Sequence, residues 1–195
     1  HGMLPIWSHH ANDNWCMIGY HAVSVLADAA VKGGMDTEHW PGLLEAALEA
    51  SVATASHPTF DGLDAYRDLG YVPADGARGQ GASVSKTLEM AYDDWCVNVL
   101  AQCTGDTATE QAYFARSQHA RNVWDPSVRF MRPRLEDGTF RQDFDVLNTH
   151  GQGFIEGNAW NYSLHVAQDV PWLIEAHGGP AAFVAHLDSL FTMEL

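Results

Sequence analysis

The stretch SVSKTLEMAYDDWCVNVLAQCTG, residues 83–105, decides the fold class, because it carries the strongest helix signal in the chain. Apolar side chains recur along it at Val84, Leu88, Ala91, Tyr92, Trp95 and Val99. Spacings of three and four residues place side chains on one face of a helix, so this stripe predicts an amphipathic helix. Gly105 follows the pattern, as expected of a residue that ends a helix in the left-handed conformation.

Five further segments have helical patterns. They are residues 16–34, 40–55, 107–124, 158–178 and 179–191, with Pro171 bending or dividing the fourth of them. Residues 59–82 and 125–154 are expected to be irregular, apart from a short hairpin about Asp137-Gly138. The prediction is therefore an all-α fold with long loops, and in such helical arrays chemistry is often placed in the loops at one end.

Length and charge limit the possible partners. The 195 residues suffice for one domain with a core, and 25 acidic against 10 basic residues give a formal charge of −15. This charge repels phosphate groups, so we expect neither nucleic acid nor a membrane as partner. No apolar run approaches the roughly 20 residues of a membrane span, and the first residues lack the pattern of a signal peptide.

Familiar motifs of other enzyme classes are absent from the sequence. It contains no GxSxG, P-loop or dinucleotide-binding pattern, which argues against triad hydrolases, NTPases and Rossmann enzymes. Eleven histidines show no zinc-binding spacing, and three cysteines do not suggest a disulfide framework. Cys96 and Cys103 would lie about 10 Å apart on one helix, beyond the reach of a disulfide.

The stretch GFIEGNAWNYS, residues 153–163, contains the leading candidate for catalysis, Glu156. A carboxylic acid can protonate a leaving group when partial burial raises its pKa, and Trp160 and Tyr162 could supply the apolar walls. Asn158 can cap the following helix and also donate to a sugar hydroxyl. The alternative is that Glu156 only favours a helix N-terminus electrostatically.

Other polar residues have two interpretations each. Asp93 and Asp94 form an acidic cluster with Glu89, which either meets a cation or stays solvated. Arg132 and its neighbouring arginines could orient carboxylates such as Glu156, or serve only in ion pairs. The flat face of a tryptophan ring can bind a sugar, although packing in the core is the commoner role of a tryptophan. The tryptophans near loop or motif positions are Trp7, Trp15, Trp95 and Trp160.

Five motifs taken together closely resemble the glycoside hydrolase family 92 α-mannosidases. In chain order they are GMLPIW…CMIGYHAV, GYVPAD, SVSKTLEMAYDDWCV, WDPSVRFMRPRLEDGTF and FIEGNAWNYSLHVAQDV, and they extend over nearly the whole chain. The resemblance implies an (α/α)6 barrel, or helical toroid, preceded by a β-sandwich domain. It implies calcium-dependent, exo-acting hydrolysis of α-linked mannose with inversion, with Glu156 as the general acid.

The resemblance also assigns substrate-binding residues and a context. It places Trp7, Trp15 and Cys16 near the substrate pocket, where we also expect Asn158, Trp160, Arg132 and Asp93. The family's general base and calcium ligands lie in later segments, so we expect no metal ligand in this chain. Residues 1–195 would be a single segment of the catalytic domain, incomplete at both ends and inactive alone, with the remaining segments of the same enzyme as partners.

The resemblance further suggests a mannose-containing glycan as substrate, with α-1,2 linkage, a role in N-glycan processing and a secreted, periplasmic or cell-surface location. The family usually carries Pro-His-Asp where this chain has Ala167-Gln168-Asp169, which leaves the linkage open. Two alternatives remain. One is a non-catalytic mannose-binding or scaffold relative, and the other is a different (α/α) barrel glycosidase with Asp93 as its base.

Overall fold

The structure, a computed structural model, describes residues 4–10, 12–13, 17–52 and 61–193. Helices dominate it, which confirms the predicted class. In chain order the elements are β1 Ser8–His9, β2 Asn12–Asp13, α1 Ala22–Val31, η1 Thr37–His39, α2 Trp40–Val52, α3 Leu63–Leu69, α4 Ser83–Thr104, α5 Thr107–Ser117, η3 Gln118–Val123, β3 Trp124–Asp125, β4 Phe130–Met131, α6 Ala159–Tyr162, η4 Ala167–Asp169, α7 Val170–Ala176 and α8 Pro180–Thr192.

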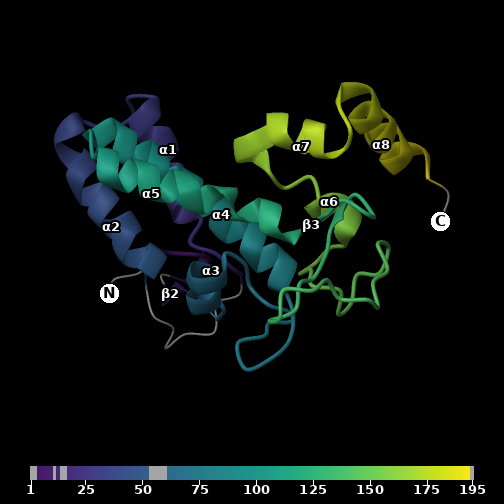
Figure 1. The fold of residues 1–195 in the computed structure, drawn as a ribbon. Helices are drawn as coiled ribbons and strands as arrows, with labels where there is room; N and C mark the ends of the chain where they lie inside the picture. The colour runs from purple at the N-terminus through teal and green to yellow at the C-terminus, as the bar shows by residue number, and fades with distance from the viewer. Residues whose placement is uncertain (1–3, 11, 14–16, 53–60, 194–195) are drawn as a thin grey trace.

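Helix α4 runs through the middle of the molecule, with α1, α2 and α5 along one half and α6, α7 and α8 beyond the other (Figure 1). Two buried apolar clusters follow this division. The first joins α1 and α2 to the C-terminal half of α4, through residues such as Val97 and Leu100. The second joins the N-terminal half of α4, through Val84 and Leu88, to the segments around β4, α6 and α7.

The position of α4 between two clusters corrects the expected single apolar stripe. Buried residues surround the helix, and they include polar ones such as Thr87, Asp93 and Asn98. A helix that is covered on all sides does not show one apolar face, which is why an amphipathic pattern describes only part of its contacts. The predicted bounds of this helix are confirmed, and Gly105 adopts the expected left-handed conformation, with φ 75°.

Several other helix boundaries differ from the predicted ones. Helix α1 begins at Ala22 rather than near Cys16, because Gly19 has φ 80° and interrupts any earlier helix. Helix α5 is capped by Asp106, just before the predicted start at residue 107, and the Asp106 side chain accepts a hydrogen bond from the Thr109 amide. Residues 158–178 are divided into α6, η4 and α7, and Pro171 lies in the first turn of α7, where its missing amide hydrogen costs nothing.

Helix α3 was not expected, since it lies inside residues 59–82, which were predicted to be irregular. Left-handed glycines bound it on both sides, Gly62 and Gly70, and it buries Leu63 and Tyr66. Seven residues give too short a pattern to distinguish a helix from a loop. The short hairpin expected about Asp137-Gly138 is present, with an antiparallel bridge between Arg134 and Phe140 and a hydrogen bond from the Leu135 amide to the Thr139 carbonyl at 2.8 Å. The named antiparallel strands β3 and β4 precede it.

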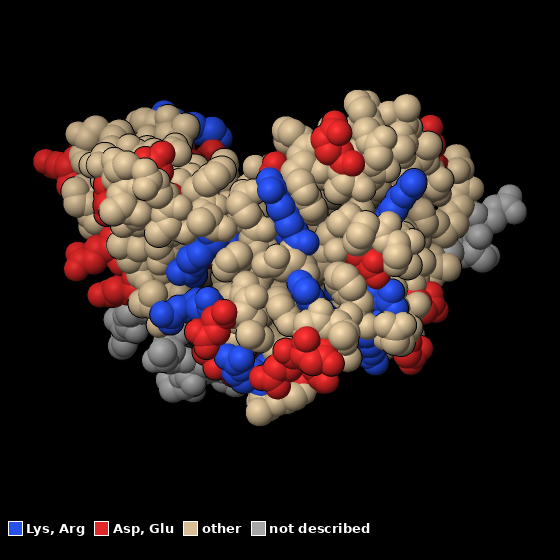
Figure 2. Space-filling view, viewed as in Figure 1, with Lys and Arg blue, Asp and Glu red and all other residues tan. Residues whose placement is uncertain are grey.

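The charged side chains do not gather into a basic surface on the face shown in Figure 2. Lys and Arg alternate there with acidic groups along the lower part, and acidic groups continue at the left edge. Among the described residues, no helix is long and apolar enough to cross a membrane.

Candidate functional site

Glu156 lies in the segment between β4 and α6, next to the first turn of α4, and its backbone is unusual. Its φ is 50°, which places a non-glycine residue in the left-handed region, and its side chain is exposed. An L-residue pays roughly 1–2 kcal/mol for this conformation. Such conformations persist where the surroundings impose them, and they concentrate at functional sites.

The segment before Glu156 is bound to the first turn of α4. The Gly153 carbonyl accepts hydrogen bonds from the Val84 amide at 2.9 Å and the Ser85 amide at 3.1 Å. Two amides that a helix N-terminus leaves without intrahelical partners are thereby satisfied. In return the Ile155 amide donates to Ser85 Oγ at 3.1 Å, so the backbone next to Glu156 is fixed to α4.

The segment after Glu156 is fixed by the start of α6. Asn158 Oδ1 accepts from the Trp160 amide at 3.0 Å, and the Asn158 amide donates to Asn161 Oδ1 at 2.8 Å, which completes a capping box. The prediction that Asn158 caps this helix is confirmed. Gly157 is needed here, because a Cβ atom would lie 2.9 Å from Asn161 Oδ1 and 3.2 Å from the Tyr162 ring.

The strain at Glu156 gives a prediction about stability. We expect Glu156→Gly to be about 1 kcal/mol more stable towards unfolding than Glu156→Ala, since only glycine adopts φ 50° without a steric cost. Denaturant unfolding of the two variants measures the difference. Arg129, which is exposed and has φ 58°, is the matched control, and its Gly and Ala variants should differ by a similar amount. An alanine variant as stable as the glycine variant at position 156 would contradict a strained backbone.

A second group of charged residues lies beside this segment, on the middle of α4. Glu89 Oε2 lies 3.3 Å from His21 Nε2 and 3.0 Å from His165 Nε2. The other ring nitrogen of His21, Nδ1, lies 2.7 Å from Asp93 Oδ1. Burial lowers the pKa of His21, but the hydrogen bond and charge of Asp93 and the charge of Glu89 outweigh it and raise this pKa to about 9. His21 is therefore an imidazolium at neutral pH, between two carboxylates.

Glycine is required for this arrangement at position 19. A Cβ atom on Gly19 would lie 2.5 Å from His21 Cε1 and 2.9 Å from Asp93 Oδ2, and its φ of 80° is itself left-handed. The turn before α1 thus brings the His21 ring against α4. The Tyr20 amide donates to Asp93 Oδ2 at 2.7 Å and holds the same turn from its other side.

The raised pKa of His21 makes stability depend on pH. Its folded pKa of about 9 exceeds the usual value near 6.5, so the contribution is complete below pH 6.5 and is lost as the pH rises to 9. The ring is about a third exposed, and allowing for solvent screening we expect a loss of about 1–2 kcal/mol. The free energy of unfolding at pH 6 and pH 9.5, compared between the wild type and His21→Gln, measures it; parallel decreases in both proteins would contradict it.

The neighbouring Asp94 forms a separate and fully buried group. It accepts hydrogen bonds from Tyr20 Oη at 2.6 Å, Tyr66 Oη at 2.8 Å and Arg116 Nε at 2.9 Å. Burial raises the pKa of Asp94 to about 6, although Arg116 and the two hydroxyls oppose this. These contacts tie three elements to α4, namely the turn before α1, helix α3 and helix α5. The role of Asp94 is therefore structural.

The acidic cluster predicted from the sequence therefore meets cations. Asp93 and Asp94 have no exposed surface, and the interpretation as a solvated face is wrong for both. Asp93 cannot touch a sugar or activate a solvent water in this arrangement, because its oxygens face His21 and the Tyr20 amide. The alternative in which Asp93 is the base of a different barrel glycosidase loses its support.

Arg132 forms its ion pair with a carboxylate other than Glu156. Its guanidinium donates to Asp125 Oδ2 at 2.8 Å and to the carbonyls of Arg141 and Gln142. These bonds close the loop between β4 and the following turn. The interpretation of Arg132 as an ion-pair residue fits this geometry, and its expected contact with substrate stays a prediction.

The predicted aromatic residues are divided between core and surface. Trp160 stacks on His186 at 4.7 Å between ring centroids and makes a T-shaped contact with Phe130 at 4.9 Å, so its ring is partly used in packing. One side of Trp160 also lines an open pocket of about 240 Å³ with Asn158, Asn161 and residues of α8. Trp7 is half exposed. Trp15 and Cys16 lie outside the described residues.

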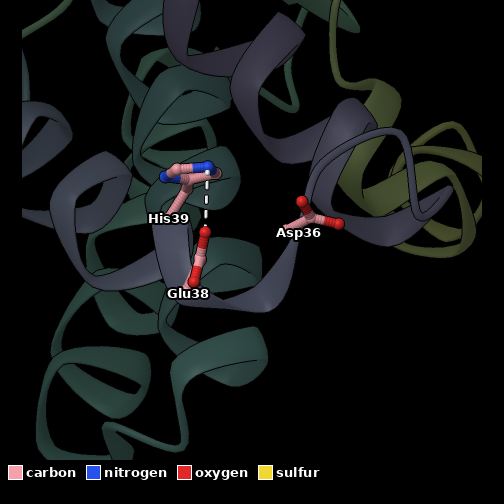
Figure 3. A group of neighbouring side chains, drawn as sticks. All are labelled: Asp36, Glu38 and His39. Atoms are coloured by element: carbon pink, nitrogen blue, oxygen red, sulfur yellow. Dashed lines mark ion pairs between the residues drawn. The ribbon is translucent and has the colours of Figure 1, made fainter.

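A calcium site was expected to draw its ligands from outside this chain. Within the described residues, one group of three possible ligands occurs, formed by Asp36, Glu38 and His39 at η1. All three are exposed, and in Figure 3 the ion pair joins Glu38 to His39 while the Asp36 carboxylate stands apart. Calcium takes six to eight oxygen ligands, so two carboxylates and an imidazole on a surface turn do not fit it.

His21 and His165 both contact Glu89, and the sequence analysis did not single them out. Both were counted among dispersed histidines, and neither forms a spacing motif with Glu89. The available signal was that Glu89 and Asp93, four residues apart, repel one another unless a cation lies between them. That cation comes from residue 21, more than sixty positions earlier in the chain.

Comparison with known proteins identifies relatives of this chain. Residues 1–195 match the model of the glycosyl hydrolase family 92 catalytic domain. A family 92 α-mannosidase of Bacteroides thetaiotaomicron is 39% identical, with a TM-score of 0.86 over 99% of this chain and 25% of its own. An inverting family 92 mannosidase of the same organism is 33% identical, with the same TM-score over 96% and 25% of the two chains.

A curated relative extends the likeness to a fungus. An uncharacterized secreted glycosidase of Arthroderma benhamiae is 30% identical over 202 residues, which cover 88% of this chain and 26% of the fungal protein. The first of the bacterial enzymes has also been solved in complex with mannoimidazole, where it is 38% identical to this chain. The chain thus spans about a quarter of the length of the relatives that it matches.

Proposed function

We propose, from the premise that this chain belongs to glycosyl hydrolase family 92, that it supplies the general acid of an exo-acting α-mannosidase. The family membership makes the chain part of a glycosidase catalytic domain. Since it spans about a quarter of its relatives, the activity proposed is that of the whole enzyme to which these residues contribute.

The observation that carries the proposal is the conformation of Glu156. An exposed carboxyl group is held in a left-handed backbone between the first turn of α4 and the cap of α6. Neither attachment involves the carboxyl group itself, and no hydrogen bond or ion pair to it is formed within residues 17–52 and 61–193. Strained and firmly anchored positions are concentrated at functional sites, and an exposed carboxyl group at such a position supports a role in proton donation.

In the proposed reaction Glu156 gives its proton to the glycosidic oxygen as the bond to the anomeric carbon breaks. Without that proton the leaving sugar would depart as an alkoxide. Water attacks the opposite face of the ring and yields the inverted sugar, and the base that activates it comes from outside residues 1–195. Inverting enzymes hold their two carboxyl groups roughly 6.5–9.5 Å apart to admit this water. The inverting mannosidase among the relatives supports this stereochemistry.

The finer parts of the proposal follow from the family resemblance. They are calcium dependence with ligands from other segments of the enzyme, a preference for α-1,2 linkages in mannose-containing glycans such as N-glycans, and an exported location. The mannoimidazole complex of one relative supports a mannose-like substrate. The name of the fungal relative, a secreted glycosidase, supports export.

Mannose release by the natural full-length protein tests the proposal. The substrates are α-1,2-, α-1,3- and α-1,6-linked mannobiose, each with calcium and with a chelator, and proton NMR follows the anomer that forms first. We expect β-mannose first, most rapidly from the α-1,2 isomer and only with calcium. Binding of mannobiose without release would favour the non-catalytic relative, and first formation of α-mannose would contradict inversion.

A further inference from the structure

Glu89 differs from the other two acidic residues of α4 in its accessibility. Asp93 and Asp94 have fully buried side chains, whereas that of Glu89 is 15% exposed. Its partners are more open still, at 36% for His21 and 35% for His165. The chain of charges that starts at buried Asp93 therefore ends at the molecular surface.

Within residues 17–52 and 61–193, protein groups contact only one of the two carboxylate oxygens of Glu89. Both histidine contacts are made by Oε2. The contact with His165 Nε2, at 3.0 Å, has the distance of an ion pair but not the direction of a hydrogen bond. Within residues 17–52 and 61–193, no group donates a hydrogen bond to Oε1. A carboxylate oxygen has two acceptor lone pairs, so Oε1 has capacity for an incoming donor.

Ser85 connects Glu89 with the segment that carries Glu156. Its Oγ accepts a hydrogen bond from the Ile155 amide at 3.1 Å, and it lies one helical turn from Glu89 on α4. Tyr162, in the helix that follows Glu156, has its ring edge-on to the ring of His165, the residue that contacts Glu89, at 6.3 Å between centroids. Burial raises the pKa of Tyr162, and the charges of Glu89 and Glu156 raise it further.

The carboxylate of Glu89 is a suitable partner for a hydroxyl group. A carboxylate accepts hydrogen bonds from hydroxyl donors, and those bonds are about twice as strong as neutral ones. The His21 ring lies between Glu89 and Asp93, 3.3 Å from the first carboxylate and 2.7 Å from the second. Asp94 ties α4 to the turn before α1, to α3 and to α5 through hydrogen bonds that do not involve Glu89.

We propose that Glu89 binds a hydroxyl group of the same sugar whose glycosidic oxygen Glu156 protonates. This inference rests on the proposed function and extends it to a residue that determines substrate specificity. Oε1 accepts the hydrogen bond of the sugar hydroxyl, while His21 and His165 fix Oε2. Glu89 takes no part in proton transfer, and its contribution is to hold the ring in register with Glu156.

A cycle of enzyme variants and deoxy sugars tests this contact in the full-length protein. Methyl α-mannosides lacking the 2-, 3-, 4- or 6-hydroxyl are compared with the complete sugar, on the wild type and on Glu89→Gln. We expect Glu89→Gln to lower kcat/KM on the complete sugar by about 10- to 100-fold. One of the four hydroxyls should be the one that Glu89 binds. Removing that hydroxyl should lower kcat/KM of Glu89→Gln little further, because the contact is already lost in this variant.

The controls separate this inference from a structural effect and from the proposed function. Glu175→Gln, on the exposed end of α7, should leave all the rates unchanged. Should Glu89→Gln lose its near-ultraviolet circular dichroism, Glu89→Asp takes its place, since it keeps the charge beside His21 but withdraws the oxygen. If removing a hydroxyl lowers kcat/KM by the same factor in the wild type and in Glu89→Gln at all four positions, Glu89 binds none of these hydroxyls. That result would overturn the role of Glu89 while leaving α-mannosidase activity intact. Absence of hydrolysis by the wild type would instead refute the proposed function.

Discussion

Glu156→Gln is expected to lower kcat for mannobiose by about 10²- to 10⁴-fold, the range that proton donation by a general acid contributes. Glutamine has nearly the same size and leaves the backbone bonds of Gly153, Ile155 and Asn158 in place. It cannot give up a proton, so the leaving sugar must depart unprotonated. Initial rates of mannose release by the full-length protein measure the effect.

The choice of leaving group separates lost acid catalysis from lost folding. 2,4-Dinitrophenyl α-mannoside needs no proton on its leaving oxygen, so Glu156→Gln should hydrolyse it at nearly the wild-type rate. Glu175→Gln serves as the matched control, because this glutamate is exposed and remote from the α4–α6 junction. An equal loss on both substrates would indicate a positional or folding role for Glu156, and normal rates on both would remove it from the mechanism.

The sequence could predict the helices whose apolar pattern is long, and it failed where helices are short or fully enclosed. Helix α4 was found because twenty-two residues repeat the pattern many times. Its environment was not found, because a helix between two clusters buries residues such as Thr87 and Asn98 that a pattern assigns to solvent. Helix α3 has seven residues, and the glycines that bound it look the same in a loop.

The sequence could predict those parts of the candidate site whose residues lie close together in the chain. Glu156 and Asn158 are two positions apart in one motif, so the turn and the helix cap that they form are local features of the sequence. The contact of Glu89 with His21 and His165 joins three distant segments, and no spacing reports it. Trp160 belongs to the same motif, but its stacking on His186 of α8 joins two separate segments, and the motif does not show it.

The second large effect is expected at Arg116, which neutralises the buried Asp94. We expect Arg116→Met to lower the free energy of unfolding by about 3–5 kcal/mol, because it leaves an uncompensated carboxylate in the interior. Arg116 Nε donates to Asp94 Oδ2, and its guanidinium lies over the Tyr113 ring at 4.5 Å. Methionine retains much of the apolar stem, so the loss reports mainly the charge. Urea unfolding at neutral pH measures it.

Two comparisons distinguish a stranded charge from lost packing. Arg121→Met breaks the more exposed pair with Asp169 and should cost about 1 kcal/mol or less. The double variant Arg116→Met with Asp94→Asn should be more stable than Arg116→Met alone, since Tyr20 and Tyr66 can still bond the neutral amide. In Arg116→Met the folded pKa of Asp94 must rise further above its unfolded value, so the variant should recover stability as the pH falls from 8 to 5. A loss that is independent of pH and unaffected by Asp94→Asn would mean that packing on Tyr113, and not the buried charge, is what Arg116 provides.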